Sequence, residues 1–205
     1  MKKSTTPDSS SEELLLSQEE YFKEHVFENV SLPKLVLLDR EFYRCTFKNA
    51  VLNFGQLSLC RFEECSFIGC DLSLSKMKDC SFIDVEFKDC KLVGIDWTNV
   101  SEPFKASFDK CKLSDTVFYK MDLRNANFTS CEIQNADFEE SNLTKAEFIN
   151  SDLSGTKFAG ANLTSADLSG ALNYYINPNS TIIKKAKFTL PEALNLLDHL
   201  DIMIK

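Results

Sequence analysis

The sequence is poor in several residue types on which common catalytic sites depend. Its 205 residues include only six Gly, five Pro, two His and one Trp. A phosphate-binding glycine loop is absent. A Ser/His/Asp or Cys/His site would require His25 or His199 to meet its other members by chance. We therefore expect no enzymatic activity, no metal and no cofactor.

Long apolar runs and an excess of basic residues are also missing. No stretch of 18 apolar residues occurs, and MKKSTTPDSSSEELLLSQEE at the N-terminus has a three-leucine run where a signal peptide needs a longer apolar segment. We expect a soluble, cytoplasmic protein without a membrane partner. The formal net charge is −8, whereas binding to phosphates needs clustered Lys and Arg. Nucleic acid is therefore not expected as a direct ligand, but a basic protein partner fits.

Large apolar residues recur at every fifth position, and this is the dominant pattern of the sequence. Sixteen such positions run from Phe22 to Trp97, and after a shift of one residue thirteen more run from Phe108 to Leu168. A period of five fits neither an α-helix nor a simple strand. A small residue or a cysteine often lies two positions earlier, as for two inward side chains of a short extended segment. The other three residues are mostly polar and can turn a corner in solvent.

The pattern of five lies within a repeat of twenty residues, which predicts a coil with four walls. Like residues then stack along each wall around a filled core. The first wall holds Phe22, Phe42, Phe62 and Phe82; the second Phe27, Phe47, Phe67 and Phe87; the third Leu32, Leu52, Leu72 and Leu92; the fourth Leu37, Leu57, Met77 and Trp97.

The shift between Trp97 and Phe108 predicts a one-residue bulge near 98–105, in a segment that contains Pro103. If the extra residue bulges from the first wall, Phe108 falls on the second wall and Leu113 on the third. The coil then continues as one solenoid to residue 170.

Units such as ANFTS, ADFEE, SNLTK, AEFIN and SDLSG, between residues 126 and 155, resemble the A(D/N)LXX units of the pentapeptide repeat family. The resemblance covers about residues 20 to 170 and implies an all-β fold, a right-handed quadrilateral β-helix of about seven coils. The C-terminal segment is similar to that of the quinolone-resistance and microcin-immunity branch, in which paired tails join two rods end to end. That branch includes DNA mimics that bind bacterial gyrase or topoisomerase IV.

All eight cysteines occupy the small inward position two residues before a large one. They are Cys45, Cys60, Cys65, Cys70, Cys80, Cys90, Cys111 and Cys131. A zinc site needs close pairs or added His ligands, which this spacing does not offer. Packing of free thiols in the core is the favoured interpretation, with a metal site and a disulfide as alternatives. Eight reduced thiols also favour a reducing compartment.

Two terminal segments flank the expected solenoid of residues 19–170. Residues 1–18 are rich in Ser and Glu, and we expect them to be disordered or weakly helical. Residues 171–205 drop the pattern: Thr189, Pro191 and Glu192 predict a helix start, and DIMIK predicts a terminal strand. Capping of the last coil is one interpretation and dimerisation is another, with the candidate residues Leu190, Leu194, Leu197, Leu200, Ile202 and Ile204.

Acidic residues are concentrated in the C-terminal half of the solenoid. Residues 122–167 carry a net charge of −5, against −1 for residues 21–121. One hypothesis is therefore a DNA mimic whose carboxylates compete for a site built for phosphates. The candidate contacts are Asp122, Glu132, Asp137, Glu147, Asp152 and Asp167. The alternatives are a general interaction scaffold or secreted effector without a topoisomerase role, or acids that only keep the rod soluble. The absence of long projecting loops argues against quinolone protection and leaves gyrase binding or toxin immunity open.

Overall fold

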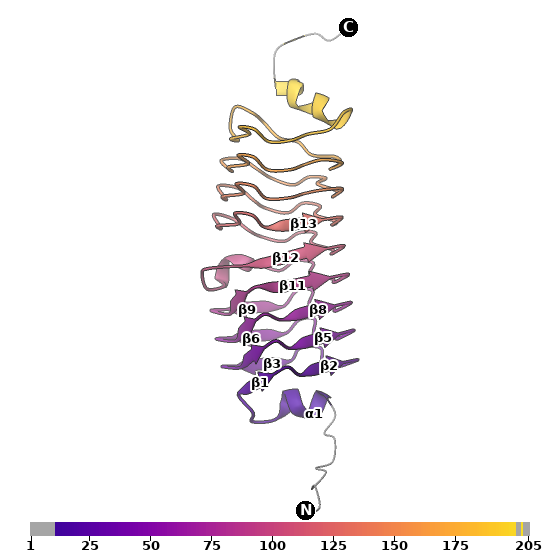
Figure 1. Ribbon diagram of the computed structural model, residues 1–205, viewed down its shortest axis with the longest axis vertical. Coiled ribbons are helices and arrows are strands. Elements are labelled where there is room, and N and C mark those ends of the chain that lie inside the picture. The colour runs from indigo at the N-terminus through magenta and orange to yellow at the C-terminus, as the bar shows by residue number, and fades with distance from the viewer. Residues whose placement is uncertain (1–10, 200–201, 203–205) are drawn as a thin grey trace, which may run out of the picture.

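The protein is a rod built from one continuous parallel β-solenoid. Figure 1 shows the rod from the side, with its long axis vertical. The computed structural model describes residues 11–199 and residue 202. The expected right-handed four-walled β-helix is confirmed. Large residues at every fifth position point inward, because two of every five side chains must face the core of so tight a coil.

Three of the four walls carry named strands, which pair in parallel one coil apart. The first wall comprises β1 (Tyr21–Lys23), β4 (Glu41–Tyr43), β7 (Arg61–Glu63) and β10 (Ser81–Ile83). The second comprises β2 (Val26–Glu28), β5 (Thr46–Lys48), β8 (Ser66–Ile68), β11 (Val85–Lys88), β12 (Ala106–Asp109) and β13 (Asn127–Thr129). The fourth comprises β3 (Val36–Leu38), β6 (Gln56–Ser58) and β9 (Lys76–Lys78).

Isolated bridges extend these ladders beyond the named strands. They form the third wall from Ser31 to Leu172 and carry the second wall on to Lys187. The strand-built part spans about five turns, fewer than the expected seven, because the later coils are joined by single bridges rather than by three-residue strands. The coil count from the sequence therefore differs slightly from that of the structure.

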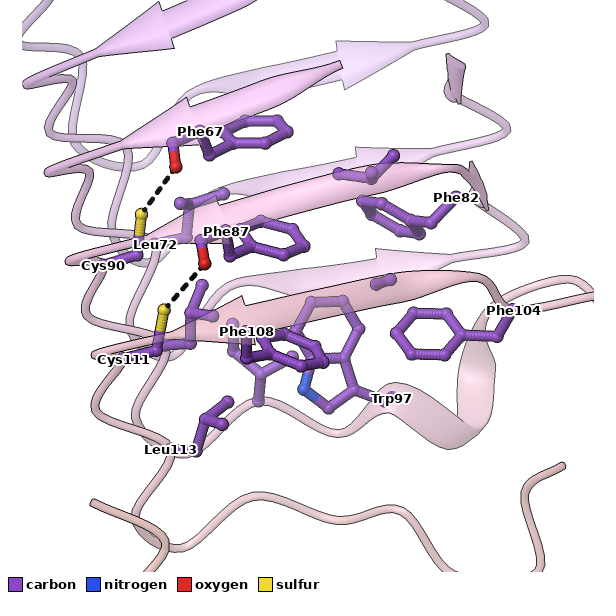
Figure 2. Packing of buried hydrophobic residues seen from close by; sticks show 14 of the residues in the cluster. Phe67, Leu72, Phe82, Phe87, Cys90, Trp97, Phe104, Phe108, Cys111 and Leu113 are labelled. Carbon is purple, nitrogen blue, oxygen red and sulfur yellow. Dashed lines mark hydrogen bonds between the residues drawn. The ribbon is translucent and has the colours of Figure 1, made fainter. Parts of the chain in front are cut away.

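Stacked aromatic rings fill the core along each wall. On the second wall, the ring centroids of Phe87 and Phe108 lie 5.3 Å apart with an interplanar angle of 6°. The register pairs these two residues directly, so the phase continues across the extra residue. That residue belongs to the loop after the 3-10 helix η1 (Trp97–Asn99), where Phe104 packs against Trp97 (Figure 2).

Short helices lie at the two ends of the rod. Helix α1 (Ser11–Leu16) places Leu15 in the core, and the Glu12 carboxylate accepts a 2.8 Å hydrogen bond from the Ser31 amide of the first coil. The C-terminal helix η2 (Glu192–His199) is a 3-10 helix. The Thr189 hydroxyl accepts a hydrogen bond from the Gly170 amide, so the side chain expected to cap the helix instead ties the tail to the preceding coil.

Candidate partner-binding surface

The residue before each large inward side chain shapes the corner that follows it. Where this residue is Asp or Asn, except at Asn127, one carboxylate or amide oxygen accepts a hydrogen bond from the backbone N–H two residues later, as in an Asx turn. These bonds are 2.9–3.3 Å long and are made by Asp71, Asp96, Asp122, Asp137, Asn142, Asp152, Asn162 and Asp167. Four of the six candidate acids are therefore also part of the turn structure.

The six candidate acids are distributed over all four walls. Asp122 lies on the first wall and Asp137 on the fourth. Glu147 and Asp167 are neighbours in adjacent coils on the second wall, and Glu132 and Asp152 are neighbours on the third. The structure thus brings together two pairs of acids on adjoining walls but does not gather all six on one face.

Three of these acids form ion pairs with neighbouring cations. Asp122 pairs with Arg124 at 2.6 Å, Glu132 with Lys112 at 3.1 Å, and Asp167 with Lys187 at 2.8 Å. Such exposed pairs contribute little to stability, but they reduce the local negative potential. Within the described part of the chain, the other three acids have no ion-pair partner.

Hydrogen bonds keep several of these carboxylates ionised. The Arg124 guanidinium lowers the pKa of Asp122, and the Lys187 ammonium lowers that of Asp167. Desolvation alone would raise the pKa of Asp152, but hydrogen bonds from Ser154, Asn173 and Gln134 outweigh it, so that the pKa falls to about 2. These groups therefore present negative charge at neutral pH.

Acidic groups outside the candidate set also contribute to this surface. Glu140 on the fourth wall accepts a 3.0 Å hydrogen bond from the Tyr119 hydroxyl and pairs with Lys120 at 3.2 Å. Lys120 lies twenty residues before Glu140, and the Lys112–Glu132 pair has the same separation. Opposite charges twenty residues apart are a sequence signal that could have identified these ion pairs.

All eight cysteines are buried free thiols, as the core-packing interpretation expects. Their hydrogen bonds add a role that spacing alone did not indicate: six of them donate to the carbonyl of a large residue in the preceding coil. Figure 2 shows this for Cys90 with the Phe67 oxygen and Cys111 with the Phe87 oxygen, both at 3.3 Å. Ser151 makes the same bond to Phe128 at 2.6 Å. The thiols are thus hydrogen-bonded bridges between coils.

Hydrogen bonds between stacked thiols shift their pKa values in both directions. The bond with Cys65 lowers the pKa of Cys45 to about 7, and the bond with Cys80 lowers that of Cys60. A hydrogen bond with Cys131 and burial raise the pKa of Cys111 to about 12, and similar causes involving Cys111 raise that of Cys90 to about 12. Thiolate, the reactive and metal-binding form, is therefore disfavoured at Cys90 and Cys111. No cluster of His, Cys, Asp and Glu suited to a metal ion is found among the described residues.

The C-terminal segment leaves apolar side chains in solvent. Leu190 is 76% exposed, Leu194 47% and Ile202 54%. Leu197 is half-buried, while Leu196, which was not a candidate, packs against the core. Leu200 and Ile204 lie outside the described residues, as does most of the predicted DIMIK strand.

Comparison with known proteins decides the family. The family model described as pentapeptide repeat region matches residues 40–102 and 101–174. The chain belongs to the pentapeptide repeat family. A comparison with curated protein sequences finds no match.

The solved structure of a fluoroquinolone resistance protein shares this fold. A trypsin-treated variant of QnrB1, a plasmid-mediated fluoroquinolone resistance protein, aligns with a TM-score of 0.61 and 17% identity, covering 91% of this chain and 100% of that one. The pentapeptide repeat protein HetL from the cyanobacterium Nostoc sp. strain PCC 7120 aligns at 16% identity with a TM-score of 0.26, covering 82% of this chain and 86% of that one. At these identities the likeness to QnrB1 establishes the fold alone. No helix in the described part of this pentapeptide repeat protein has the length and apolar character to cross a membrane.

Proposed function

We propose that this pentapeptide repeat protein is a non-enzymatic, cytoplasmic binding protein whose acidic C-terminal half engages the basic DNA-binding surface of a bacterial type II topoisomerase. Such binding would confer immunity or resistance to a toxin or drug that acts on that enzyme. The observation that carries the proposal is the charge of the turn-capping residues. Asn142 and Asn162 cap the turns that stack on the turn of Asp122, and they make the same bond, so the fold does not require the carboxylate.

The spacing of the carboxylates also supports a partner with an extended, basic binding surface. Carboxylates repeat along the rod at the spacing of successive coils, about 4.8 Å for paired strands, on the pairs Glu132–Asp152 and Glu147–Asp167. A row of spaced negative charges can compete with phosphates for a basic surface, and the affinity would fall as the salt concentration rises.

The test is a gyrase supercoiling assay at two salt concentrations, with and without a quinolone. The test variant combines Asp122→Asn, Asp137→Asn, Asp152→Asn and Asp167→Asn, which keep the turn-capping oxygen and remove four charges. The control for a double variant, Asp152→Asn with Asp167→Asn, is Asp71→Asn with Asp96→Asn, which removes the same number of charges from turns of the same kind in the preceding half. We expect the wild type and the control to alter supercoiling and the test variant to lose the effect. No binding, inhibition or protection by the wild type would refute the proposal.

We further propose that the rod is a homodimer joined through its C-terminal segment. The exposed Leu190 and Leu194 side chains support this, because one short helix above a single coil leaves them without a partner in the described part of the chain. Light scattering should give twice the mass of 23.3 kDa. A monomer at high micromolar concentration would exclude the joint.

A further inference from the structure

The backbone ladder of the first wall is interrupted after β10. The Ser101 and Lys105 amides of the loop donate to carbonyls of the preceding coil at 2.8 and 2.9 Å. Pro103 has no N–H to offer, and the Phe104 N–H is taken by the Glu102 carboxylate at 3.0 Å. The loop therefore pairs with the coil before it, and no backbone bond links it to Asp122–Arg124 in the coil after it.

Three backbone groups of that following coil lack a partner among residues 11–199. They are the N–H and C=O of Asp122 and the C=O of Arg124. One coil later, the equivalent N–H and C=O of Asn142 and the C=O of Thr144 are all paired with the preceding coil, at 2.9, 2.9 and 3.0 Å. An open parallel-strand edge thus lies in the middle of an otherwise closed wall.

A cavity of about 440 Å³ opens beside this edge. Its lining includes Asp84, Glu86, Phe104, Lys105, Leu123 and Arg124. The loop that forms one side projects from the rod next to β12 in Figure 1. The volume lies within the range of ligand-binding sites. The cavity borders the edge at Leu123 and Arg124, whereas Asp122 is not among its lining residues.

We infer that this edge binds an extended peptide of a partner protein, which adds as a parallel strand opposite Asp122–Arg124. We number the residues of a five-residue peptide in the register of the neighbouring coils. The carbonyl of its first residue would then accept a hydrogen bond from the Asp122 N–H. Its third N–H would donate to the Asp122 carbonyl and its fifth to the Arg124 carbonyl. This site shares Asp122 with the proposed topoisomerase contacts but differs from them in its chemistry, because backbone hydrogen bonds hold the peptide in addition to charge.

The side chains around the edge define the peptide further. The third residue faces the core position that Phe104 already fills, since Phe104 is only 6% exposed, so it must be small. The second residue would lie opposite Asp122 and the fourth opposite Arg124, and cross-strand neighbours favour opposite charge. At present these two side chains pair with each other at 2.6 Å. The expected sequence is basic–small–acidic at the centre.

The probe is the peptide acetyl-Thr-Lys-Ala-Glu-Thr-amide, which is titrated into the full ¹⁵N-labelled chain. The titration ends at about 5 mM peptide, a concentration that detects millimolar affinity. We expect saturable NMR shifts in residues 84–86, 104–107 and 122–126. The analogue N-methylated at Ala loses one hydrogen bond, and the analogue with Lys and Glu exchanged meets like charges. Each should bind about tenfold more weakly, the change expected for about 1.4 kcal/mol.

Two variants test the charge preference of the site, and hydrogen exchange tests the unpaired edge in the free protein. Arg124→Gln should reduce the discrimination between the two charge orders, while Arg61→Gln, on the paired strand β7, should not. In the free protein, the Asp122 amide should exchange at least about a hundredfold faster than the paired Asn142 amide. Equal protection of these two amides, equal binding of all three peptides, or no shifts around the cavity would each overturn the inference.

Discussion

The hydrogen-bonding role of the thiols predicts the effect of replacing Cys111. Its Sγ donates to the Phe87 carbonyl at 3.3 Å, which also lies in the paired ladder of β11 and β12. Cys111→Ala removes the hydrogen bond from the thiol, which costs about 0.5–1.5 kcal/mol, and the void left by sulfur adds to this cost. Cys111→Val restores volume without a donor and should recover only the packing part. Cys111→Ser keeps a donor, as Ser151 does at 2.6 Å, and should remain within about 1 kcal/mol of the wild type.

The assay is urea unfolding followed by circular dichroism, with midpoints compared at a common slope. The alanine variant should fold, because Ala50 already occupies the equivalent position on an earlier coil. We expect the order of stability to be wild type, then Ser, then Val, then Ala. If Val matches the wild type and Ser is the least stable, the thiols act only as apolar spacers.

Further predictions concern pH, reactivity and assembly. All eight thiols should react slowly with iodoacetamide in the folded chain and rapidly in urea. Because the folded pKa of Cys111 is about 12, against an ordinary value of 9.0, its contribution to stability is complete below pH 9 and is lost as the pH rises toward 12, which alkaline unfolding curves would show. The folded pKa of Asp152 is about 2, against 3.8, so its contribution is present above pH 4 and lost as the pH falls toward 2; Asp152→Asn should abolish that part of the acid transition. Leu194→Asp should shift light scattering from dimer to monomer, whereas Lys184→Asp, outside the helix, should not.

Most of the fold follows from spacing in the sequence. The period of twenty determines which residues stack, and it predicts Phe87 opposite Phe108 through the assumption of a single bulge, as the register shows. The thiol bridges could not be predicted in the same way, because the acceptor carbonyl usually lies 23 residues earlier in the chain and its direction depends on the corner geometry. Pro103 indicated an irregularity but not that an unpaired edge would follow it.

The candidate acids were only partly predictable for a related physical reason. Their walls follow from the repeat, but the amount of free charge on each wall depends on partners that approach from neighbouring coils. Lys112 and Lys187 offset Glu132 and Asp167, whereas Glu147 has no ion pair in the described part of the chain. The acidic half is therefore less uniform than its net charge of −5 suggests.

The shared role of Asp and Asn at the corners separates stability from surface charge in this fold. Both side chains supply the oxygen that accepts the N–H two residues later, as Asp137 and Asn142 do in successive corners. Exchange between them changes the charge of the rod with little effect on its turns. Solubility alone requires acids somewhere on the surface. It does not require four of the six turn-capping Asp residues to lie in the C-terminal half. A partner that reads charge would impose such an asymmetry. If the four-Asn variant retained both its thermal stability and its effect on supercoiling, that explanation would fail and the acids would serve solubility alone.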